Sequence, residues 1–389
     1  MAGPKKTRPI GQSTLAVHGG ADHRGPGDPI SQPLVQSVNY VQEFGAKGGE
    51  EIQYSRYGNT PNIELMQRRI ALLEGSEEAL VLASGMGATA CAILALLRPG
   101  DHMISSSWIY GGTHKLFTQE LVAMGIEVTF VNPDERRVFT NSMRQNTRVI
   151  FVESPVNPTA RVIDIAKLAL LAKSAGVALV VDSTLASPIN CRPIAHGADV
   201  VIHSATKYLN GHHDILCGVV AGTSSYIEEV RRKMIVWGQA PDPFACWLLE
   251  RGIKTLDVRV KRCNENAMKV AESCEGRPEI RKVHYAGLAS HRDHALAKKL
   301  LDGFGGLLSI ELAGGSDAAD HFVRKLKMIS LASSFGGVDT LVIEPRYSSH
   351  AHMTSAERAE IGIPDGFLRL SIGIENAEDI IADISQALQ

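Results

Sequence analysis

Short apolar segments alternate with longer helical segments between residues 62 and 207, and this alternation constrains the fold most strongly. The runs EALVLAS, HMISSS, EVTFVNP, RVIFVES, VALVVDS and ADVVIHSATK are typical of buried strands, whereas GATACAILALL and IAKLALLAKSAG are typical of helices. Apolar strands that alternate with helices favour a mostly parallel sheet covered on both faces. The sequence therefore predicts a large α/β domain.

The segments on either side have a different character. Residues 1–50 are rich in Gly, Pro, Ser and Gln and have little periodicity, which predicts an extended arm lying on a partner subunit. From residue 247 onward, LLERGIKTLDVRVKRCNENAMKVAESC predicts one long amphipathic helix, and the strands GGLLSIEL and FLRLSIG alternate with two further helices. We therefore divide the chain into the arm (1–50), the large α/β domain (51–246) and a smaller α+β domain (247–389).

Composition excludes several classes of partner. The formal net charge of −2 over 389 residues gives no reason to expect nucleic acid. No apolar stretch approaches the ~20 residues that span a membrane, and the basic start MAGPKKTRP predicts a disordered terminus rather than a signal peptide. The six cysteines form no CxxC pair, which favours free thiols in a reducing compartment. We therefore expect a cytoplasmic protein.

Polar side chains follow several of the predicted strands. In a parallel sheet, ligands bind beyond the carboxyl ends of the strands. An isolated acid and lysine there, such as Asp182 and Lys207, are most simply interpreted as a salt bridge. The residues in this position are Ser84, Gly85, Glu153, Asn157, Asp182, Ser204, Thr206 and Lys207.

The set as a whole points to a phosphate-bearing aldehyde. The turn SGMGAT leads into a helix and leaves backbone N–H groups free for an anion, and Ser204 and Thr206 add hydroxyl donors. Lys207 can bond covalently to an aldehyde, and Asp182 can keep a pyridine nitrogen protonated. These are the requirements of pyridoxal 5′-phosphate, which the sequence predicts as the cofactor.

Eight motifs, in order over nearly the whole chain, carry a family resemblance. The chain resembles the pyridoxal-phosphate enzymes of cysteine and methionine metabolism, the trans-sulfuration family of cystathionine γ-synthase, cystathionine γ-lyase and methionine γ-lyase. This resemblance implies the aminotransferase-like fold (fold type I), with a sheet of the seven-stranded type. The motifs are YSRYGN, LEGSEEALVLASGMGA, YGGTHKLF, ESPVNPT, VDST, HSATKYLNGHHD, SSFGGVDTL and LRLSIG.

The resemblance implies roles in cofactor binding. Lys207 would hold the cofactor covalently and move protons, and Asp182 would pair with the ring nitrogen. Tyr110 would stack on the ring and take part in proton transfer. The implied phosphate ligands are Ser204, Thr206 and the backbone of Gly85 and Met86, with Tyr54 and Arg56 reaching in from a neighbouring subunit.

The resemblance also implies a substrate site. Asn157 would contact the ring hydroxyl and the substrate, Arg369 would bind the substrate carboxylate with two hydrogen bonds, and Ser334 would lie beside it. Taken singly, each of these residues has an ordinary structural interpretation, such as an interface aromatic, a solvated charge or a turn residue. Their order along the chain favours the functional interpretation, and it implies a homo-oligomer, a dimer or a dimer of dimers, with a shared active site.

Two histidine clusters suggest a metal site. His212, His213 and Asp214 are adjacent, and His291 lies near His294. Neither cluster comes with the further ligands that a site requires. We therefore predict polar loop roles and no metal.

The implied reaction is that of a transferase or carbon–sulfur lyase acting at Cγ of an amino acid. We expect γ-replacement on an O-acylhomoserine, as in cystathionine γ-synthase. The alternatives are γ-elimination to 2-oxobutanoate, ammonia and a thiol, a homoserine sulfhydrylase, and a cofactor-binding regulator without activity. Gln53 and Ser333 are uncharged where many cystathionine-handling relatives have acids, and methionine γ-lyases tend to have cysteine at the position of Gly112. We also expect Arg346 and Tyr347 to shape the pocket entrance.

Overall fold

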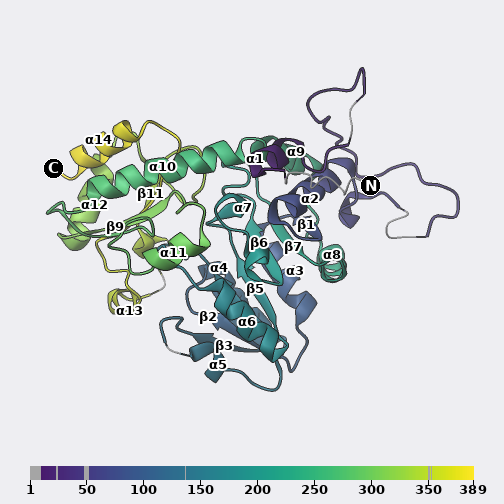
Figure 1. Cartoon of the computed structure of the whole chain (residues 1–389), viewed down its shortest axis with the longest axis horizontal. Helices are drawn as coiled ribbons and strands as arrows, with labels where there is room; N and C mark the ends of the chain where they lie inside the picture. Colours follow the sequence, from purple (N-terminus) through teal and green to yellow (C-terminus); the bar gives the residue numbers. More distant parts are fainter. Residues whose placement is uncertain (1–9, 23–24, 48–51, 136, 349–350, 352) are drawn as a thin grey trace, which may run out of the picture.

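A seven-stranded sheet forms the centre of the molecule, in the spatial order β1-β7-β6-β5-β4-β2-β3 (Figure 1). The structure is a computed structural model that describes residues 10–22, 25–47, 52–135, 137–348, 351 and 353–389, so the basic start at 1–9 lies outside it. The strands are β1 (Glu78–Leu82), β2 (His102–Ser106), β3 (Glu127–Val131), β4 (Thr147–Glu153), β5 (Ala178–Asp182), β6 (Val200–Ser204) and β7 (Gly218–Gly222).

All strands of this sheet except β7 run parallel, which confirms the mostly parallel sheet. β7 lies antiparallel between β1 and β6, and the alternation of apolar runs did not predict it. It is short and bounded by glycines. A Cβ atom at Gly218 would lie 2.1 Å from the carbonyl oxygen of Ser84, so this strand needs a residue without a side chain there.

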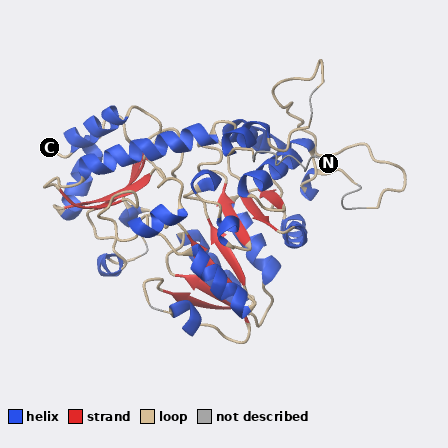
Figure 2. Ribbon diagram, viewed as in Figure 1, coloured by secondary structure: helices blue, strands red, loops and turns tan. Residues whose placement is uncertain are grey.

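Helices cover both faces of the large sheet (Figure 2). Alternate residues of β6 face opposite ways: Val201 packs with α2 and α9, whereas Val200 and Ile202 pack with α3 and α8. The helical segments up to this point are α2 (Pro61–Glu74), α3 (Gly85–Leu96), α4 (Gly111–Lys115), the π-helical turn η3 (Leu116–Leu121), α5 (Val138–Asn141), α6 (Ile165–Ala175), α7 (Ser187–Asn190), α8 (Ser224–Trp237), α9 (Pro243–Ile253), and the 3-10 turns η2 (Ser55–Tyr57) and η4 (Pro193–His196).

A second sheet of five strands has the order β10-β11-β12-β9-β8. Helices α10, α12 and α14 pack on it around a separate apolar core (Figure 1). Its strands are β8 (Ile280–His284), β9 (Leu307–Leu312), β10 (Ser330–Leu331), β11 (Leu341–Ile343) and β12 (Phe367–Ser371). The helical segments are α10 (Leu256–Cys274), α11 (His294–Leu300), α12 (Gly315–Lys325), α13 (Ser355–Glu360), α14 (Ala377–Ala387) and the 3-10 turn η5 (Pro345–Tyr347).

The expectation of one long helix after residue 247 is wrong. The chain forms two helices, α9 and α10, which separate at Lys254 and Thr255. Gly252 packs against Asn210 so closely that a Cβ atom would lie 2.4 Å from the carbonyl oxygen of Asn210. The predicted start of the smaller domain at residue 247 falls inside α9, and the division into domains stays a prediction.

The arm is not wholly extended. Residues Gln12–His18 form helix α1, whose Ala16 is buried against the main core, and Ser13 Oγ donates to Asp257 of α10 at 2.6 Å. Residues 25–47 form long loops, parts of which extend away from the body (Figure 1). They are held to the body at Val35, whose N–H donates to Asn62 Oδ1 at 2.9 Å, and at Gln32, whose carbonyl oxygen accepts from Trp247 Nε1 at 2.8 Å. Val41 and Phe44 in these loops are fully exposed. Among the described residues, no helix is long and apolar enough to cross a membrane.

Candidate active site

A cavity of about 670 Å³ lies at the carboxyl ends of the large sheet and extends to residues near β11 and β12. It gathers every predicted site residue except Tyr54 and Arg56. The predicted residues that line it are Gly85, Met86, Tyr110, Asn157, Asp182, Ser204, Thr206, Lys207, Ser334 and Arg369. The roles of these residues stay predictions.

Lys207 lies in the turn that follows β6. Its backbone N–H donates to the carbonyl oxygen of Ser204, which tightens the turn. Its Nζ donates to Ser334 Oγ at 2.8 Å and lies 5.1 Å from the centre of the Phe335 ring. Burial, and then the charge of Arg369, lower the pKa of Lys207 to about 8. Among the described residues Lys207 forms no salt bridge with Asp182. Its lowered pKa makes a neutral amine accessible near physiological pH.

Asp182 ends β5 and faces Glu153, the last residue of β4, across the parallel register. Asp182 Oδ1 accepts from Thr184 twice, from its backbone N–H at 3.0 Å and from its hydroxyl at 2.5 Å. Among the described residues Oδ2 has no hydrogen-bond partner. Burial raises the pKa of Asp182, so a cationic partner would restore its charged form.

The first turn of α3 forms an anion cradle. Ser84 caps the helix by accepting from the N–H of Gly87 at 3.0 Å, and the N–H groups of Gly85 and Met86 have no intrahelical acceptor. A Cβ atom on Gly85 would lie 2.8 Å from Ser204 Oγ, so glycine is required for the turn and the hydroxyl to approach. Converging amides and hydroxyls at a helix N-terminus suit a phosphate group.

Arg369 lies in β12 and is buried, with 6% of its surface exposed. Its guanidinium donates to Asn157 Oδ1 at 3.2 Å and to the carbonyl oxygen of Ser334 at 2.5 Å, and its Nε has no partner. No described carboxylate forms an ion pair with it, and burial lowers its pKa to about 10. A buried guanidinium held only by neutral oxygens suits a carboxylate from a ligand.

Tyr54 and Arg56 lie apart from this cavity. Tyr54 forms an isolated bridge with Asn39, and Arg56 is exposed at η2, 5.6 Å from the ring of Tyr54. Nothing in the single chain brings them to the cavity that the other residues line.

Reasoning from the sequence missed two residues of the site and gave a third residue no role. Thr184 links two strand ends, because its hydroxyl donates to Asp182 and accepts from the N–H of Ser204 at 2.8 Å. The ring of Phe335 packs against both the amine of Lys207 and the guanidinium of Arg369. Glu153 was placed after a strand without a role. Thr184 and Phe335 were within the quoted motifs VDST and SSFGG, but only spatial contacts reveal what they do.

Two further predictions concern a metal site and the entrance of the pocket. Among the described residues no group of three or more His, Cys, Asp or Glu is arranged to hold a metal. Arg346 bonds Glu344 and Asp320 and stacks on Tyr347, and neither Arg346 nor Tyr347 lines the cavity. Their neighbour Ser348 does line it.

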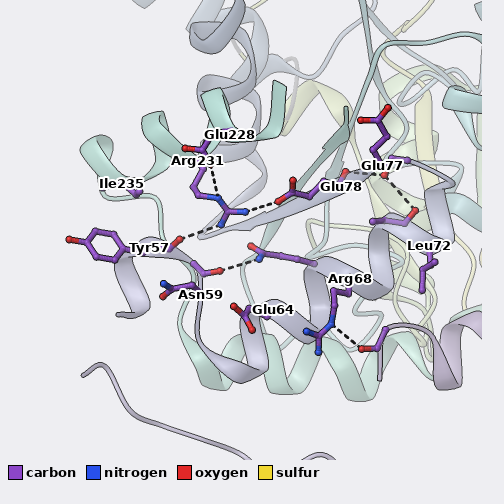
Figure 3. A pocket seen from close by; sticks show the side chains of 15 residues that line it. Tyr57, Asn59, Glu64, Arg68, Leu72, Glu77, Glu78, Glu228, Arg231 and Ile235 are labelled. Atoms are coloured by element: carbon purple, nitrogen blue, oxygen red, sulfur yellow. Dashed lines mark hydrogen bonds and ion pairs between the residues drawn. The ribbon is translucent and has the colours of Figure 1, made fainter. Parts of the chain in front are cut away.

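A second hollow, of about 760 Å³, lies between α2, β1 and α8 (Figure 3). Its Arg231 is already engaged by Glu78 at 2.8 Å, by Glu228 at 3.4 Å and by the carbonyl oxygen of Tyr57. It contains no lysine and none of the predicted site residues. The first cavity is therefore the candidate active site.

The chain is similar to known proteins over nearly its whole length. Residues 13–389 match the family of Cys/Met metabolism PLP-dependent enzymes. An L-methionine γ-lyase of Fusobacterium nucleatum subsp. polymorphum is 36% identical, with 99% of each chain covered. A cystathionine γ-lyase of Bacillus subtilis is 38% identical, with 97% of this chain and 99% of the relative covered. A cystathionine γ-synthase of Xanthomonas oryzae pv. oryzae, solved with aminoacrylate and cysteine, superposes with a TM-score of 0.93 at 36% identity, with 98% of each chain covered.

The chain belongs to the family of pyridoxal-phosphate-dependent enzymes of cysteine and methionine metabolism. It is an enzyme that uses pyridoxal phosphate, and its substrates are small molecules, namely amino acids. The donor set fits this cofactor: the cradle at Gly85 suits the phosphate, the free Oδ2 of Asp182 suits a protonated ring nitrogen, and the Lys207 amine suits the aldehyde.

Proposed function

We propose that the enzyme acts at Cγ of a homoserine-derived or sulfur amino acid, and that its first activity is γ-replacement on an O-acylhomoserine. The observation that carries the proposal is the Lys207 amine, held 2.8 Å from Ser334 Oγ in the same cavity as the buried Arg369. The likeness to a cystathionine γ-synthase solved with cysteine supports the replacement reaction.

Each residue has a separate task. Lys207, Asp182, Ser204, Thr206 and the α3 amides hold the cofactor, which when bound accepts electrons from the substrate's α carbon. The guanidinium of Arg369 binds and orients the substrate carboxylate. This orientation presents the α and β carbons of the substrate to the amine of Lys207.

Lys207 is the proposed general base at both carbons. A neutral amine would take the proton from Cα, pass it to the bound cofactor and, neutral again, take the proton from Cβ, after which the γ substituent can leave. Its lowered pKa, about 8, keeps a usable fraction neutral at physiological pH. Tyr110, half-exposed at the mouth of the cavity, is the proposed second proton carrier.

A specific observation favours γ-elimination as a second candidate. Among the described residues, the charged ones that line the cavity are Glu153, Asp182, Lys207 and Arg369. The last three belong to the proposed cofactor and carboxylate sites, and the buried Glu153 already accepts from two backbone N–H groups. The other lining residues include Leu216, Ser333, Ile343 and Ser348, which offer no charge to a distal ammonium group. An uncharged side chain such as that of methionine suits this wall.

We also propose a homo-oligomer whose active site is shared. Tyr54 and Arg56 lie outside the cavity of their own chain, and the loops around Val41 and Phe44 expose apolar side chains that a second copy would cover. A dimer of dimers is the proposed assembly. Six buried free thiols support the cytoplasm as the proposed compartment.

Substrate comparison tests the proposal. The enzyme is incubated with O-acylhomoserine with and without cysteine, and separately with methionine and with cystathionine. Cystathionine formed from O-acylhomoserine only when cysteine is present supports γ-replacement. Ammonia and 2-oxobutanoate from a sulfur amino acid support γ-elimination. Turnover of none of these would contradict action at Cγ.

A further inference from the structure

Glu153 is a buried carboxylate in the cavity that none of the proposed steps uses. Only 5% of its surface is exposed, and it lies opposite Asp182 at the strand ends. Burial and the Asp182 charge raise the pKa of Glu153, whereas hydrogen bonds from the backbone N–H groups of Asn157 and Tyr110 lower it. Two buried carboxyl groups side by side are unfavourable, so specific contacts must offset the free-energy cost of burying the Glu153 side chain.

Both oxygens of Glu153 accept hydrogen bonds from backbone groups. Oε2 accepts from the N–H of Tyr110 at 2.8 Å, and Oε1 accepts from the N–H of Asn157 at 3.0 Å. Tyr110 precedes α4 on the loop after β2, whereas Asn157 belongs to the loop after β4. One side chain therefore joins two separate loops at the edge of the sheet.

These contacts continue through the site. Asn157 Oδ1 accepts from Arg369, Arg369 also donates to the carbonyl oxygen of Ser334, and Ser334 Oγ accepts from Lys207. Tyr110 is 50% exposed, so its position depends on its backbone more than on packing of its ring. Glu153 is the point at which the Tyr110 loop meets this series of hydrogen bonds.

We propose that Glu153 is a positioning residue, whose two carboxylate oxygens hold the Tyr110 and Asn157 loops in the arrangement that the cofactor ring and substrate carboxylate require. A carboxylate is needed because two N–H donors require two acceptor oxygens. Glutamine keeps the length but has one acceptor, and aspartate keeps the charge but is too short to reach both loops. The proposal rests on the proposed roles of Tyr110 and Asn157, not on which sulfur substrate is used.

Glu153→Gln and Glu153→Asp test this proposal, with Asp383→Asn as the matched control. Asp383 is equally buried and accepts from the backbone N–H groups of Lys327, Met328 and Ile329, but it does not line the cavity. The cofactor-free proteins are titrated with pyridoxal phosphate, and circular dichroism in the cofactor band reports how the ring is held. Far-ultraviolet circular dichroism reports the fold, and steady-state kinetics gives kcat and KM.

We expect both Glu153 variants to fold and to bind the cofactor about tenfold more weakly, as losing one buried hydrogen-bond partner predicts. Their cofactor-band signal should change, with a lower kcat and a higher KM. Asp383→Asn should lower the melting temperature and leave cofactor affinity unchanged.

Three outcomes would overturn the proposal. The first is wild-type affinity and cofactor-band signal in Glu153→Gln. The second is wild-type behaviour in Glu153→Asp alone, which would make charge, rather than reach, the important property. The third is loss of the fold in both variants, which would assign Glu153 to folding alone. Cofactor titration needs no turnover, so failure of the Cγ reaction would not be confused with any of these outcomes.

Discussion

Lys207 Nζ and Ser334 Oγ lie 2.8 Å apart although 127 residues separate them in the chain. Ser334 has a φ of +88°, a left-handed conformation that is unfavourable for a residue with a side chain. In this conformation its hydroxyl reaches Lys207 while its carbonyl oxygen accepts from Arg369. The strained residue thus links the amine of the large sheet to the guanidinium of the small sheet.

Replacing Ser334 by glycine should therefore separate stability from activity. Ser334→Gly relieves the positive φ and should stabilise the fold by about 1 kcal/mol, while loss of the hydroxyl should lower kcat about tenfold. Arg137→Gly, at a φ of +60° on the surface, is the control and should affect stability alone. Thermal unfolding and kinetics measure both effects. An unchanged kcat in Ser334→Gly would remove Ser334 from the site.

The lowered pKa of Lys207 predicts its reactivity in the cofactor-free protein. A pKa of about 8 means that the neutral amine accumulates as pH rises through 8, whereas an ordinary lysine needs a pH above 10. Labelling with an amine-selective reagent, followed by peptide mapping, should give a half-maximal rate near pH 8. Arg369→Met removes the second cause of the shift and should move this midpoint upward. A midpoint above pH 10 in the wild type would show that burial does not act on this amine.

Gly112 should tolerate no side chain without disturbing Tyr110. A Cβ atom at Gly112 would lie 2.5 Å from the Tyr110 ring and 3.1 Å from Met86 Sδ. Gly112→Ala should therefore move the ring, lower kcat about tenfold and change the cofactor-band circular dichroism. Gly11→Ala is the control, because a Cβ atom there meets nothing within 4 Å, and this variant should be neutral. Gly100→Ala is a poorer control because the positive φ of Gly100 is itself unfavourable for alanine. Full activity in Gly112→Ala would mean that Tyr110 can move without cost.

Mixing two inactive variants tests the shared active site. Lys207→Ala removes the amine and Arg56→Ala removes the residue proposed to serve the neighbouring chain. If the site is shared, a hybrid dimer contains one site with both lesions and one site with neither. After subunit exchange in equal amounts, activity should recover to about a quarter of the wild-type value. No recovery after verified exchange, or an active monomer in sedimentation, would contradict the shared site.

The local pattern of apolar residues in the sequence predicted most strands of the large sheet. Apolar periodicity located six of the seven strands of the large sheet, because buried parallel strands are continuous apolar runs. The Gly-bounded β7 was missed because Gly218 serves a close approach of Ser84 rather than a turn. The separation of α9 from α10 was missed for a similar reason, since Gly252 meets the loop at Asn210 only in the folded chain.

Residue types and their order along the chain predicted which residues form the site. They did not predict which of these residues are hydrogen-bonded to one another. Strand-end position marked Asp182, Lys207 and Glu153 as a group. The hydroxyl of Thr184 also accepts from the backbone N–H of Ser204, 20 residues further along the chain, and Glu153 accepts from the backbone N–H of Tyr110, 43 residues earlier. No sequence spacing encodes such long-range hydrogen bonds. Likewise, only the folded chain places Arg346 against Asp320 and away from the cavity.

The central claim is that the amine of Lys207 is the group to which pyridoxal phosphate is covalently attached. Reduction of the holoenzyme with borohydride, followed by proteolysis and mass spectrometry, tests it most directly. We predict a single cofactor-derived adduct on the peptide that contains Lys207. An adduct on another lysine, or an unmodified Lys207 in an enzyme that has bound the cofactor, would contradict the account.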